Sequence, residues 1–437
     1  MTNNIPQLRF PEFVGEWEEK RLGEICVMTS SKRVYLSDYT EFGIPFYRGK
    51  EITELKEGKK PTDILYITED SYNSFKDKYG VPVIGDILIT AVGTLGNVLK
   101  IDNNEKFYFK DGNLIWLREV TENSNFLEKL IQLKTNELIK TSIGSTQKAL
   151  TMVELRKLQF MFPFPAEQTR IATFLTAVDK RINLLEDKKK ALEKYKKGVM
   201  QKVFDGNWVK VGGQLKFQPP TIRFKNEDSS DFPDWEEKKL GELYSFNKTN
   251  SFSRDKLNYV DGDVKNIHYG DIHTKFAAHF DIEKEYVPYI NLDIDLSKIA
   301  DDCFVQQGDL VVADASEDYA DIGKAIEVIH LNNEKLVAGL HTFLARRKNK
   351  KMVVGFGGHL FKSFYLRLSI MRIAQGTKVL SISTTRLAEI KVQIPRHEEQ
   401  QKIAEFLSSI DRSIEKMDRQ INLSQEWKKG LLQKMFV

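Results

Sequence analysis

The sequence is poor in the residues that build metal centres and disulfide frameworks. Its 437 residues include two cysteines, Cys26 and Cys303, and seven histidines, all within the second half of the chain. The cysteines lie far apart and match no metal-ligand spacing. Two such thiols in a chain of this length are typical of a protein kept reduced in the cytoplasm. We therefore expect a cytoplasmic protein. His268 and His273 are predicted to be loop or strand residues, with a pair of metal ligands as the alternative, so we expect no bound metal.

Hydrophobic runs long enough for a membrane are also missing. No stretch approaches the roughly 18 consecutive apolar residues of a membrane-spanning helix. The polar start of the chain, Met1 to Gln7, is unlike a secretory signal peptide. These absences predict a protein without a membrane partner.

Local signatures of catalysis are absent as well. Gly323-Lys324 stands without the rest of a phosphate-binding GxxxxGK[ST] loop. The only Pro-Pro pair, Pro219-Pro220, lacks the aromatic residue with which an amino-methyltransferase stacks its flipped base. Pro233-Asp234 with the nearby Glu236 resembles a nuclease motif, but the spacing is too short and the first half of the chain lacks the Pro-Asp. We therefore expect neither a catalytic site nor a cofactor bound by this chain.

What the chain does contain is one long segment used twice. Residues 160–204 overlay residues 392–436 at a constant offset of 232 positions, without a gap. Matched positions include Pro163 with Pro395, Gln168 with Gln400, Ile171 with Ile403, Phe174 with Phe406, Asp179 with Asp411, and Lys196 with Lys428. Such agreement indicates an internal duplication.

Both copies carry the alternating three- and four-residue steps of a coiled-coil seam. The seam residues are Leu175, Val178, Ile182, Leu185 and Leu192 in the first copy and Leu407, Ile410, Ile414, Met417 and Ile421 in the second. We expect helices over residues 166–205 and 396–437, with about 38 residues at about 1.5 Å each giving rods of about 57 Å. The helices either pack separately on their own domains or pair in one antiparallel bundle, and we favour the pairing.

Charge is distributed unevenly along the chain. Residues 166–204 hold 10 basic and 5 acidic side chains, whereas residues 1–165 hold 22 and 23, and residues 205–395 hold 26 and 27. The positive surplus therefore lies on the predicted helices. A nucleic-acid-binding face on the other parts of the chain must be a local patch.

The duplication extends beyond the helices. Leu8-Arg9-Phe10 and the run from Trp17 to Glu24 return as Ile222-Arg223-Phe224 and the run from Trp235 to Glu242. Short apolar runs bounded by Gly, Pro and Asn follow in both halves and favour strands with turns. We predict an α+β fold with two pseudo-symmetric mixed α/β domains separated by two long antiparallel coiled-coil helices. The predicted domains are residues 1–165 and 206–395, the latter beginning with a linker over 206–220.

These motifs resemble the DNA-specificity subunit of type I restriction–modification systems. The resemblance rests on the repeated opening, on the Gly-Asp elements at Gly85-Asp86 and Gly308-Asp309, and on the small polar loop that ends in lysine in both halves. It rests above all on the Pro…Glu-Gln…Ile-Ala-x-Phe-Leu block, which begins at Pro163 and again at Pro395. It covers nearly the whole chain.

The resemblance implies a non-catalytic reader of DNA. Residues 1–165 and 206–395 would be target-recognition domains, each reading one half of a bipartite double-stranded site, and the helices would set the gap between the halves. Two methyltransferase subunits would dock on this chain and use S-adenosylmethionine, and ATP- and Mg²⁺-dependent motor subunits would join for restriction. The alternative function is a coiled-coil adaptor that presents two protein-binding domains.

Direct readout of bases needs polar side chains on loops, and phosphate contacts use Lys, Ser and Thr. The candidate DNA-binding residues of the first domain are Tyr47, Arg48, Lys50, Thr90, Thr94, Ser145, Thr146, Gln147 and Lys148. Those of the second are His268, Tyr269, His273, Lys275, Ser316, Lys324, Thr377 and Lys378. For each single residue, a solvated loop position is the alternative.

Overall fold

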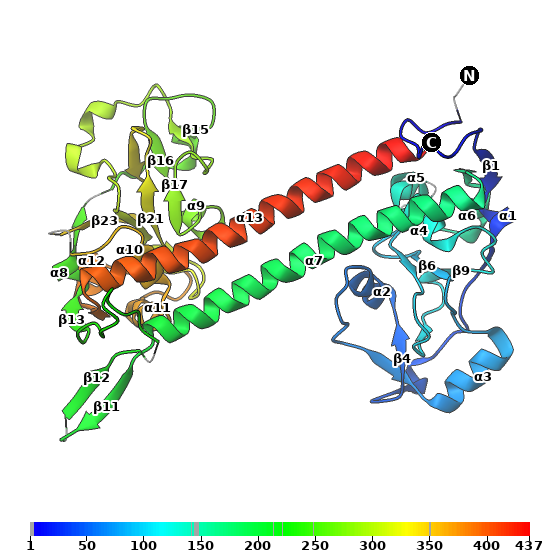
Figure 1. Cartoon of the computed structure of the whole chain (residues 1–437), viewed down its shortest axis with the longest axis horizontal. Coiled ribbons are helices and arrows are strands. Elements are labelled where there is room, and N and C mark those ends of the chain that lie inside the picture. Colours follow the sequence, from blue (N-terminus) through cyan, green and yellow to red (C-terminus); the bar gives the residue numbers. More distant parts are fainter. Residues whose placement is uncertain are drawn as a thin grey trace. The chain divides into compact units, whose positions relative to one another are not determined.

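The computed structural model describes residues 4–140, 142–143, 148–212, 214–220, 222–247, 249–348 and 351–437. The chain groups into two compact units (Figure 1): unit 1 comprises Met1–Glu186 and Arg419–Val437, and unit 2 comprises Asp187–Asp418. Each unit contains one mixed α/β domain and a part of each of two long helices. Among the described residues, no helix combines the length and the apolar character needed to cross a bilayer.

Unit 1 is built on two four-stranded sheets, with the strand orders β2-β9-β6-β7 and β3-β5-β4-β8. Their strands are β2 (Val27–Thr29), β3 (Tyr39–Thr40), β4 (Ile44–Tyr47), β5 (Leu65–Ile67), β6 (Ile87–Thr90), β7 (Val98–Lys100), β8 (Tyr108–Phe109) and β9 (Leu114–Arg118). Along β6, Ile87 and Ile89 join the core that contains α4 (Ser124–Leu133), whereas Leu88 joins a second core on the opposite face. Because both faces are buried, this strand has consecutive apolar residues instead of alternation.

Unit 2 follows the same plan with one additional strand. Its larger sheet has the order β14-β23-β19-β21-β17 and its smaller sheet the order β15-β18-β16-β22. Their strands are β14 (Tyr244–Asn247), β15 (Leu257–Asn258), β16 (Lys265–Ile267), β17 (His279–Asp281), β18 (Tyr289–Ile290), β19 (Leu310–Ala313), β21 (Ala325–His330), β22 (Leu336–Ala338) and β23 (Thr342–Arg347). Strand β17 pairs parallel to β21, and in the described residues of unit 1 the corresponding sheet ends at β7.

Short helices cover these sheets. In unit 1 they include α1 (Leu22–Ile25), α2 (Gly49–Lys56), α3 (Glu69–Tyr79), α5 (Thr135–Lys140) and α6 (Met152–Lys157). In unit 2 they include α8 (Leu240–Leu243), α9 (Tyr269–Thr274), α10 (Phe356–Lys362), α11 (Phe364–Ile373) and α12 (Thr384–Glu389). Residues 206–220, predicted as a linker, contain a hairpin of β11 (Asn207–Val211) and β12 (Gln214–Gln218).

The two long helices are α7 (Pro165–Phe204) and α13 (His397–Met435). Each follows a strand that pairs antiparallel with the opening of its domain: β10 (Gln159–Phe162) pairs with β1 (Glu18–Arg21), and β25 (Lys391–Ile394) with β13 (Glu236–Lys239). In each unit a part of α7 and a part of α13 share the hydrophobic core with the domain. The predicted fold class, with two mixed domains and two long helices, is confirmed.

Ion pairs fix the register of the helices within each unit. They join Lys428 to Asp179 in unit 1, and Lys189 to Asp418 and Lys196 to Asp411 in unit 2. Lys196 comes seven residues after Lys189, and Asp411 seven residues before Asp418, so the helices run antiparallel there. Lys189, Lys196 and Lys428 therefore each meet a carboxylate of the other long helix.

The seam residues are buried to different degrees. Leu175, Val178, Ile182, Leu407, Ile410, Met417 and Ile421 are buried, whereas Leu185, Leu192 and Ile414 are half-buried. Leu175, Val178 and Ile182 share the core of the first domain, and Leu407 and Ile410 share that of the second. There, apolar side chains of the domain close the seam.

The Glu-Gln pair at the start of each repeat makes equivalent contacts in both units. Arg9 donates two hydrogen bonds to Glu167, of 2.8 and 2.7 Å. Arg223 donates two to Glu399, of 3.0 and 2.7 Å. The glutamine that follows each glutamate is buried and donates to the carbonyl oxygen of the proline five residues earlier. The motif therefore ties the opening segment of each domain to the start of its long helix.

The two cysteines differ in their surroundings. Cys26 is buried, and burial raises the pKa of its thiol to about 12. Cys303 is half-buried, and its pKa is raised first by burial and then by Asp302. Because the thiolate is the reactive form, we expect a thiol reagent at pH 8 to modify Cys303 first and Cys26 only after unfolding. Two equally fast labelling phases in the native protein would contradict this burial.

Candidate nucleic-acid interface

Three segments of the first domain meet beside the end of β4. They are α2, the loop after β6, and the segment that leads into α6. Asn97 in the loop donates to Thr53 Oγ1 of α2 (2.8 Å), and Lys56 Nζ donates to Asn97 Oδ1 (2.9 Å). A β-bridge between Val92 and Ala149 attaches the third segment. The structure therefore brings together the three loops on which the candidate residues of this domain were predicted.

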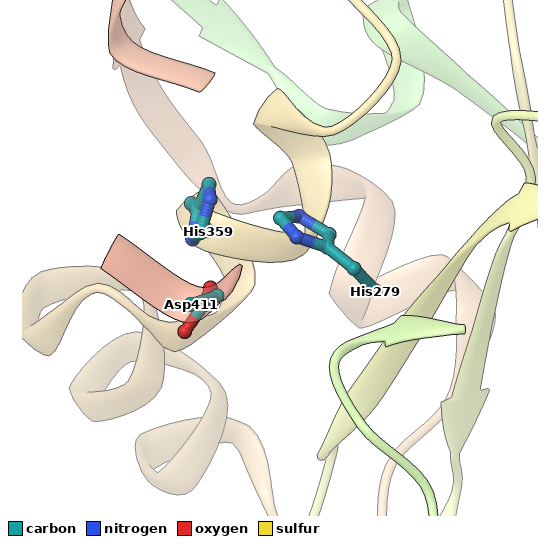
Figure 2. A group of neighbouring side chains, drawn as sticks. All are labelled: His279, His359 and Asp411. Carbon is teal, nitrogen blue, oxygen red and sulfur yellow. The ribbon is translucent and has the colours of Figure 1, made fainter. Parts of the chain in front are cut away.

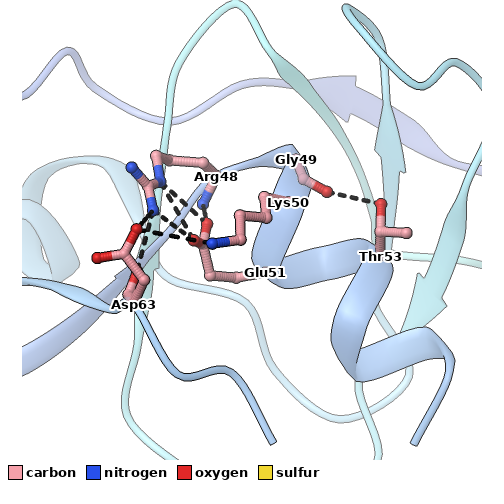
Figure 3. A network of polar contacts seen from close by, with 6 residues as sticks. All are labelled: Arg48, Gly49, Lys50, Glu51, Thr53 and Asp63. Atoms are coloured by element: carbon pink, nitrogen blue, oxygen red, sulfur yellow. Dashed lines mark hydrogen bonds and ion pairs between the residues drawn. The ribbon is translucent and has the colours of Figure 1, made fainter. Parts of the chain in front are cut away.

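Arg48 is held at the start of α2 by ion pairs (Figure 3). Its Nη2 lies 2.6 Å from Glu51 Oε1 and donates to the carbonyl oxygen of Asp63 at 2.9 Å. Glu51 is fully buried and also accepts from the Arg48 backbone N–H at 2.7 Å. Burial raises the pKa of Glu51, but these hydrogen bonds outweigh it and hold the pKa below its ordinary value. Arg48 therefore supports the helix start, while Lys50 remains exposed beside it.

The other candidates of this domain separate into buried and exposed groups. Tyr47 stacks on Phe107 with ring centroids 5.0 Å apart. Thr90 is buried, donates to the Thr94 carbonyl oxygen and accepts from the Asn97 N–H, so it shapes the loop. Thr94 and Lys148 are exposed. The candidates Ser145, Thr146 and Gln147 lie outside the described residues.

The second domain assembles the equivalent three segments. The ring Nε2 of His273, on α9, lies 3.1 Å from the Ala315 carbonyl oxygen, in the segment between β19 and β21. Lys324 Nζ, at the end of that segment, donates to the His273 carbonyl oxygen at 3.4 Å. Strand β20 (Ala315–Ser316) pairs with β24 (Leu380–Ser381), which follows the predicted Thr377-Lys378 loop. The two domains thus build their candidate surfaces from corresponding loops.

A cluster of histidines surrounds Tyr269 in this domain. The centroid of its ring lies 4.6 Å from that of His268, 5.8 Å from that of His273 and 5.3 Å from that of His341. His268 Nδ1 accepts from the Gly270 N–H, and burial lowers the pKa of His268 to about 4. His268 therefore stays neutral at physiological pH. Sequence reasoning missed His341, because a single histidine after a strand has no spacing signature.

The remaining candidates of the second domain again divide by exposure. Lys275 is exposed and lies 2.9 Å from the buried Asp271. Ser316 is buried, and its Oγ accepts from the Asp318 N–H. Thr377 and Lys378 are exposed.

A cavity of about 920 Å³ adjoins His273 and Lys324 in unit 2. Its cationic lining residues are Lys196, Lys197, Lys324, Lys362 and Arg367, and its acidic ones are Glu193 and Asp411. Burial, followed by the charge of Lys196, lowers the pKa of Lys362 to about 8. The excess of cations makes this cavity suited to an anion such as a phosphate group.

Comparisons with known proteins agree with this architecture. The family model for the type I restriction modification DNA specificity domain matches residues 15–194 and 233–425. A Haemophilus influenzae protein that carries the name of a type I restriction enzyme specificity subunit is 31% identical over 169 residues, which are 38% of this chain and 41% of that protein. The similarly named MjaX subunit of Methanocaldococcus jannaschii is 23% identical over 425 residues, covering 94% of this chain and 91% of that one.

A solved structure is similar in fold. The crystal structure of the S subunit of a type I restriction–modification system from M. genitalium superposes with a TM-score of 0.58 at 14% identity, covering 99% of both chains. At that identity the likeness shows the fold alone. Because the specificity domain is matched twice and its architecture recurs in both units, the chain belongs to the family of type I restriction–modification DNA-specificity subunits.

Proposed function

We propose that this chain reads a bipartite DNA sequence for a type I restriction–modification complex, with each mixed domain binding one half-site. One observation carries the proposal: the family's domain occurs twice, and in both copies the same three loops meet. Duplicated reading surfaces suit a site made of two halves. We further propose that α7 and α13 set the gap between the halves.

The exposed candidates are proposed to contact DNA, and the buried ones to position them. Lysine and threonine side chains suit phosphate contacts, and the exposed set is Lys50, Thr94, Lys148, Lys275, Thr377 and Lys378. Arg48, Thr90, His268 and Ser316 already have partners within the protein. We assign these four to holding the loops.

An apolar groove on the helices of unit 2 is proposed to receive a methyltransferase subunit. The groove has a volume of about 660 Å³, and Tyr195, Val199, Ile222, Phe224 and Phe406 contribute to its lining. Tyr195 and Ile222 are exposed, so a partner that covered them would remove apolar surface from water. Under this proposal S-adenosylmethionine, ATP and Mg²⁺ belong to partner subunits, which act with this chain in the cytoplasm.

Reconstitution with the cognate methyltransferase subunits tests the function. Methylated adenines mapped in cells that express the complex should define one split motif, and purified complex should bind that motif with strong salt dependence. The chain alone should show neither methylation nor cleavage. If the complete complex never discriminates between DNA sequences, the adaptor alternative replaces the reader.

A single lysine tests the phosphate-contacting role. We expect Lys378→Ala to weaken binding several-fold at every DNA sequence and to lower the slope of log affinity against log salt by about one. The matched control is Lys298→Ala, which removes another exposed lysine of the same unit, one that lies 3.7 Å from Asp295. If both substitutions change the salt slope equally, Lys378 does not contact a DNA phosphate.

A further inference from the structure

We propose that unit 2 contains a transition-metal site formed by His279, His359 and Asp411 (Figure 2). The three residues come from β17, α10 and α13, so they join the domain to a long helix. One possible ligand atom of each residue lies within 4.8 Å of those of the other two. Small rotations of these side chains would bring the three atoms around one ion.

His359 is the strongest indication of a missing partner. Its side chain is fully buried, and neither ring nitrogen has a hydrogen-bond partner among the described residues. Buried polar atoms are normally satisfied, because leaving one unpaired costs free energy. Burial, followed by the charges of His279 and Lys196, places the pKa of His359 well below its ordinary value. The ring is therefore neutral, which is the form that binds a metal.

His279 is oriented as a metal ligand usually is. Its Nε2 lies 2.8 Å from the Gly355 carbonyl oxygen, which fixes the proton on Nε2 and leaves Nδ1 as the free lone pair. Metal-binding histidines commonly donate their second N–H to a carbonyl oxygen in this way. The His279 and His359 rings meet edge to face with centroids 4.3 Å apart.

Asp411 supplies the third ligand and the negative charge. It lies on the wall of the 920 Å³ cavity, where Lys196 is its counterion. A divalent ion would displace the Lys196 ammonium, which can move into the same open cavity. Asp411 borders this cavity, which has room for a water molecule as the fourth ligand.

Unit 1 shows what occupies the equivalent place when no metal is needed. Asp179 and Lys428 are the repeat partners of Asp411 and Lys196. Lys129 on α4 donates to Asp179 at 2.8 Å, and it follows Phe126 by three residues, as His359 follows Phe356 on α10. These phenylalanines pack on Phe436 and Phe204, which are also repeat partners. Unit 2 therefore has a neutral histidine where unit 1 has a lysine cation.

The ligand set indicates the class of metal. Two imidazoles and one carboxylate suit Zn²⁺, with Co²⁺ as its spectroscopic substitute, whereas Mg²⁺ and Ca²⁺ prefer ligand sets made of oxygen. A bound ion would tie β17 and α10 to α13. The site would thus stabilise unit 2 against unfolding.

Metal titration of the full-length chain tests the site. After removal of metals with a chelator, we expect one tightly bound Zn²⁺ per chain by calorimetry and elemental analysis, and a Co²⁺ absorption spectrum of a four-coordinate site. At free Zn²⁺ about 100 times the Kd, the Tm should rise by about 5 °C. A chain that binds no stoichiometric Zn²⁺ under these conditions overturns the proposal.

Substitutions locate the ion. His359→Gln and His279→Gln should each weaken Zn²⁺ binding at least 100-fold and abolish the rise in Tm, while retaining a native circular dichroism spectrum. The matched control is His330→Gln in the group Asp281, Glu283 and His330 of the same unit, which should leave the tight site intact. If His330→Gln abolishes binding and the other two do not, the site is elsewhere.

Lys196→Met separates coordination from a merely structural role. Because Lys196 competes with the metal for Asp411, its removal should tighten Zn²⁺ binding about tenfold or more. A structural defect would instead weaken binding or leave it unchanged, and either result would contradict the proposed geometry.

Discussion

Glu399→Ala lowers the free energy of unfolding by about 3 kcal/mol, as we expect for the loss of one partner from a buried ion pair. Glu399 is completely buried, and Arg223 has 18% of its side chain exposed. Arg223 donates two hydrogen bonds to this carboxylate and one to the Pro233 carbonyl oxygen. Without Glu399 the guanidinium loses its two-hydrogen-bond partner while most of its surface stays out of water, which is the origin of the large effect.

The control is an ion pair on the surface of the same unit. Lys391 lies 2.7 Å from Glu237, with 62% and 37% of their side chains exposed. Glu237→Ala should cost less than about 1 kcal/mol, because water and salt screen an exposed pair. Urea unfolding followed by circular dichroism and tryptophan fluorescence compares the two variants. Equal losses would show that the Arg–Glu contact does not anchor the domain to its helix.

The long helices were predictable because their signal is repeated and periodic. The seam residues of the two repeated segments lie within α7 and α13. The motif residues that follow Pro163 and Pro395 lie where these helices begin. The contacts of the motif were not predictable. Glu167 and Arg9 are 158 positions apart, and nothing in the pattern links them before the chain folds.

The candidate interface was predictable as a set of loops and less so as residues. Arg48 was predicted as a DNA-binding candidate, and Glu51, three residues later, engages it through a capping interaction that the sequence already contained. Thr90, His268 and Ser316 are buried, because polar residues at strand ends often satisfy the backbone of the next turn. The repeat did not indicate strand β17, because it has no counterpart among the described residues of unit 1.

Removing one heptad from both long helices is expected to shorten the gap between the half-sites by about three base pairs. A heptad of helix is about 10.5 Å long, and each base pair advances about 3.4 Å. The deletion takes residues 186–192 from α7 and residues 415–421 from α13. It removes the Lys189–Asp418 pair as a whole and leaves the Lys196–Asp411 and Lys428–Asp179 pairs in register.

Methylation mapping in cells that express the variant with its partners measures the result. The two half-site sequences should stay the same, because the domains are unchanged, while the number of unspecified bases between them falls. Three base pairs also turn the second half-site by about 100° around the DNA axis. We therefore expect the variant to methylate sites with the shortened gap less than the unchanged protein methylates sites with the original gap.

Deletion of residues 186–192 from α7 alone provides the control. It shifts α7 against α13 by seven residues, so Lys196 no longer faces Asp411 while Lys428 still faces Asp179. The two ion pairs, Lys196–Asp411 and Lys428–Asp179, can then no longer form in the same helix pair. We therefore expect methylation to be lost at every spacing. If instead the double deletion keeps the parental gap, the helices do not set the distance, and spacing must be fixed by the partner subunits.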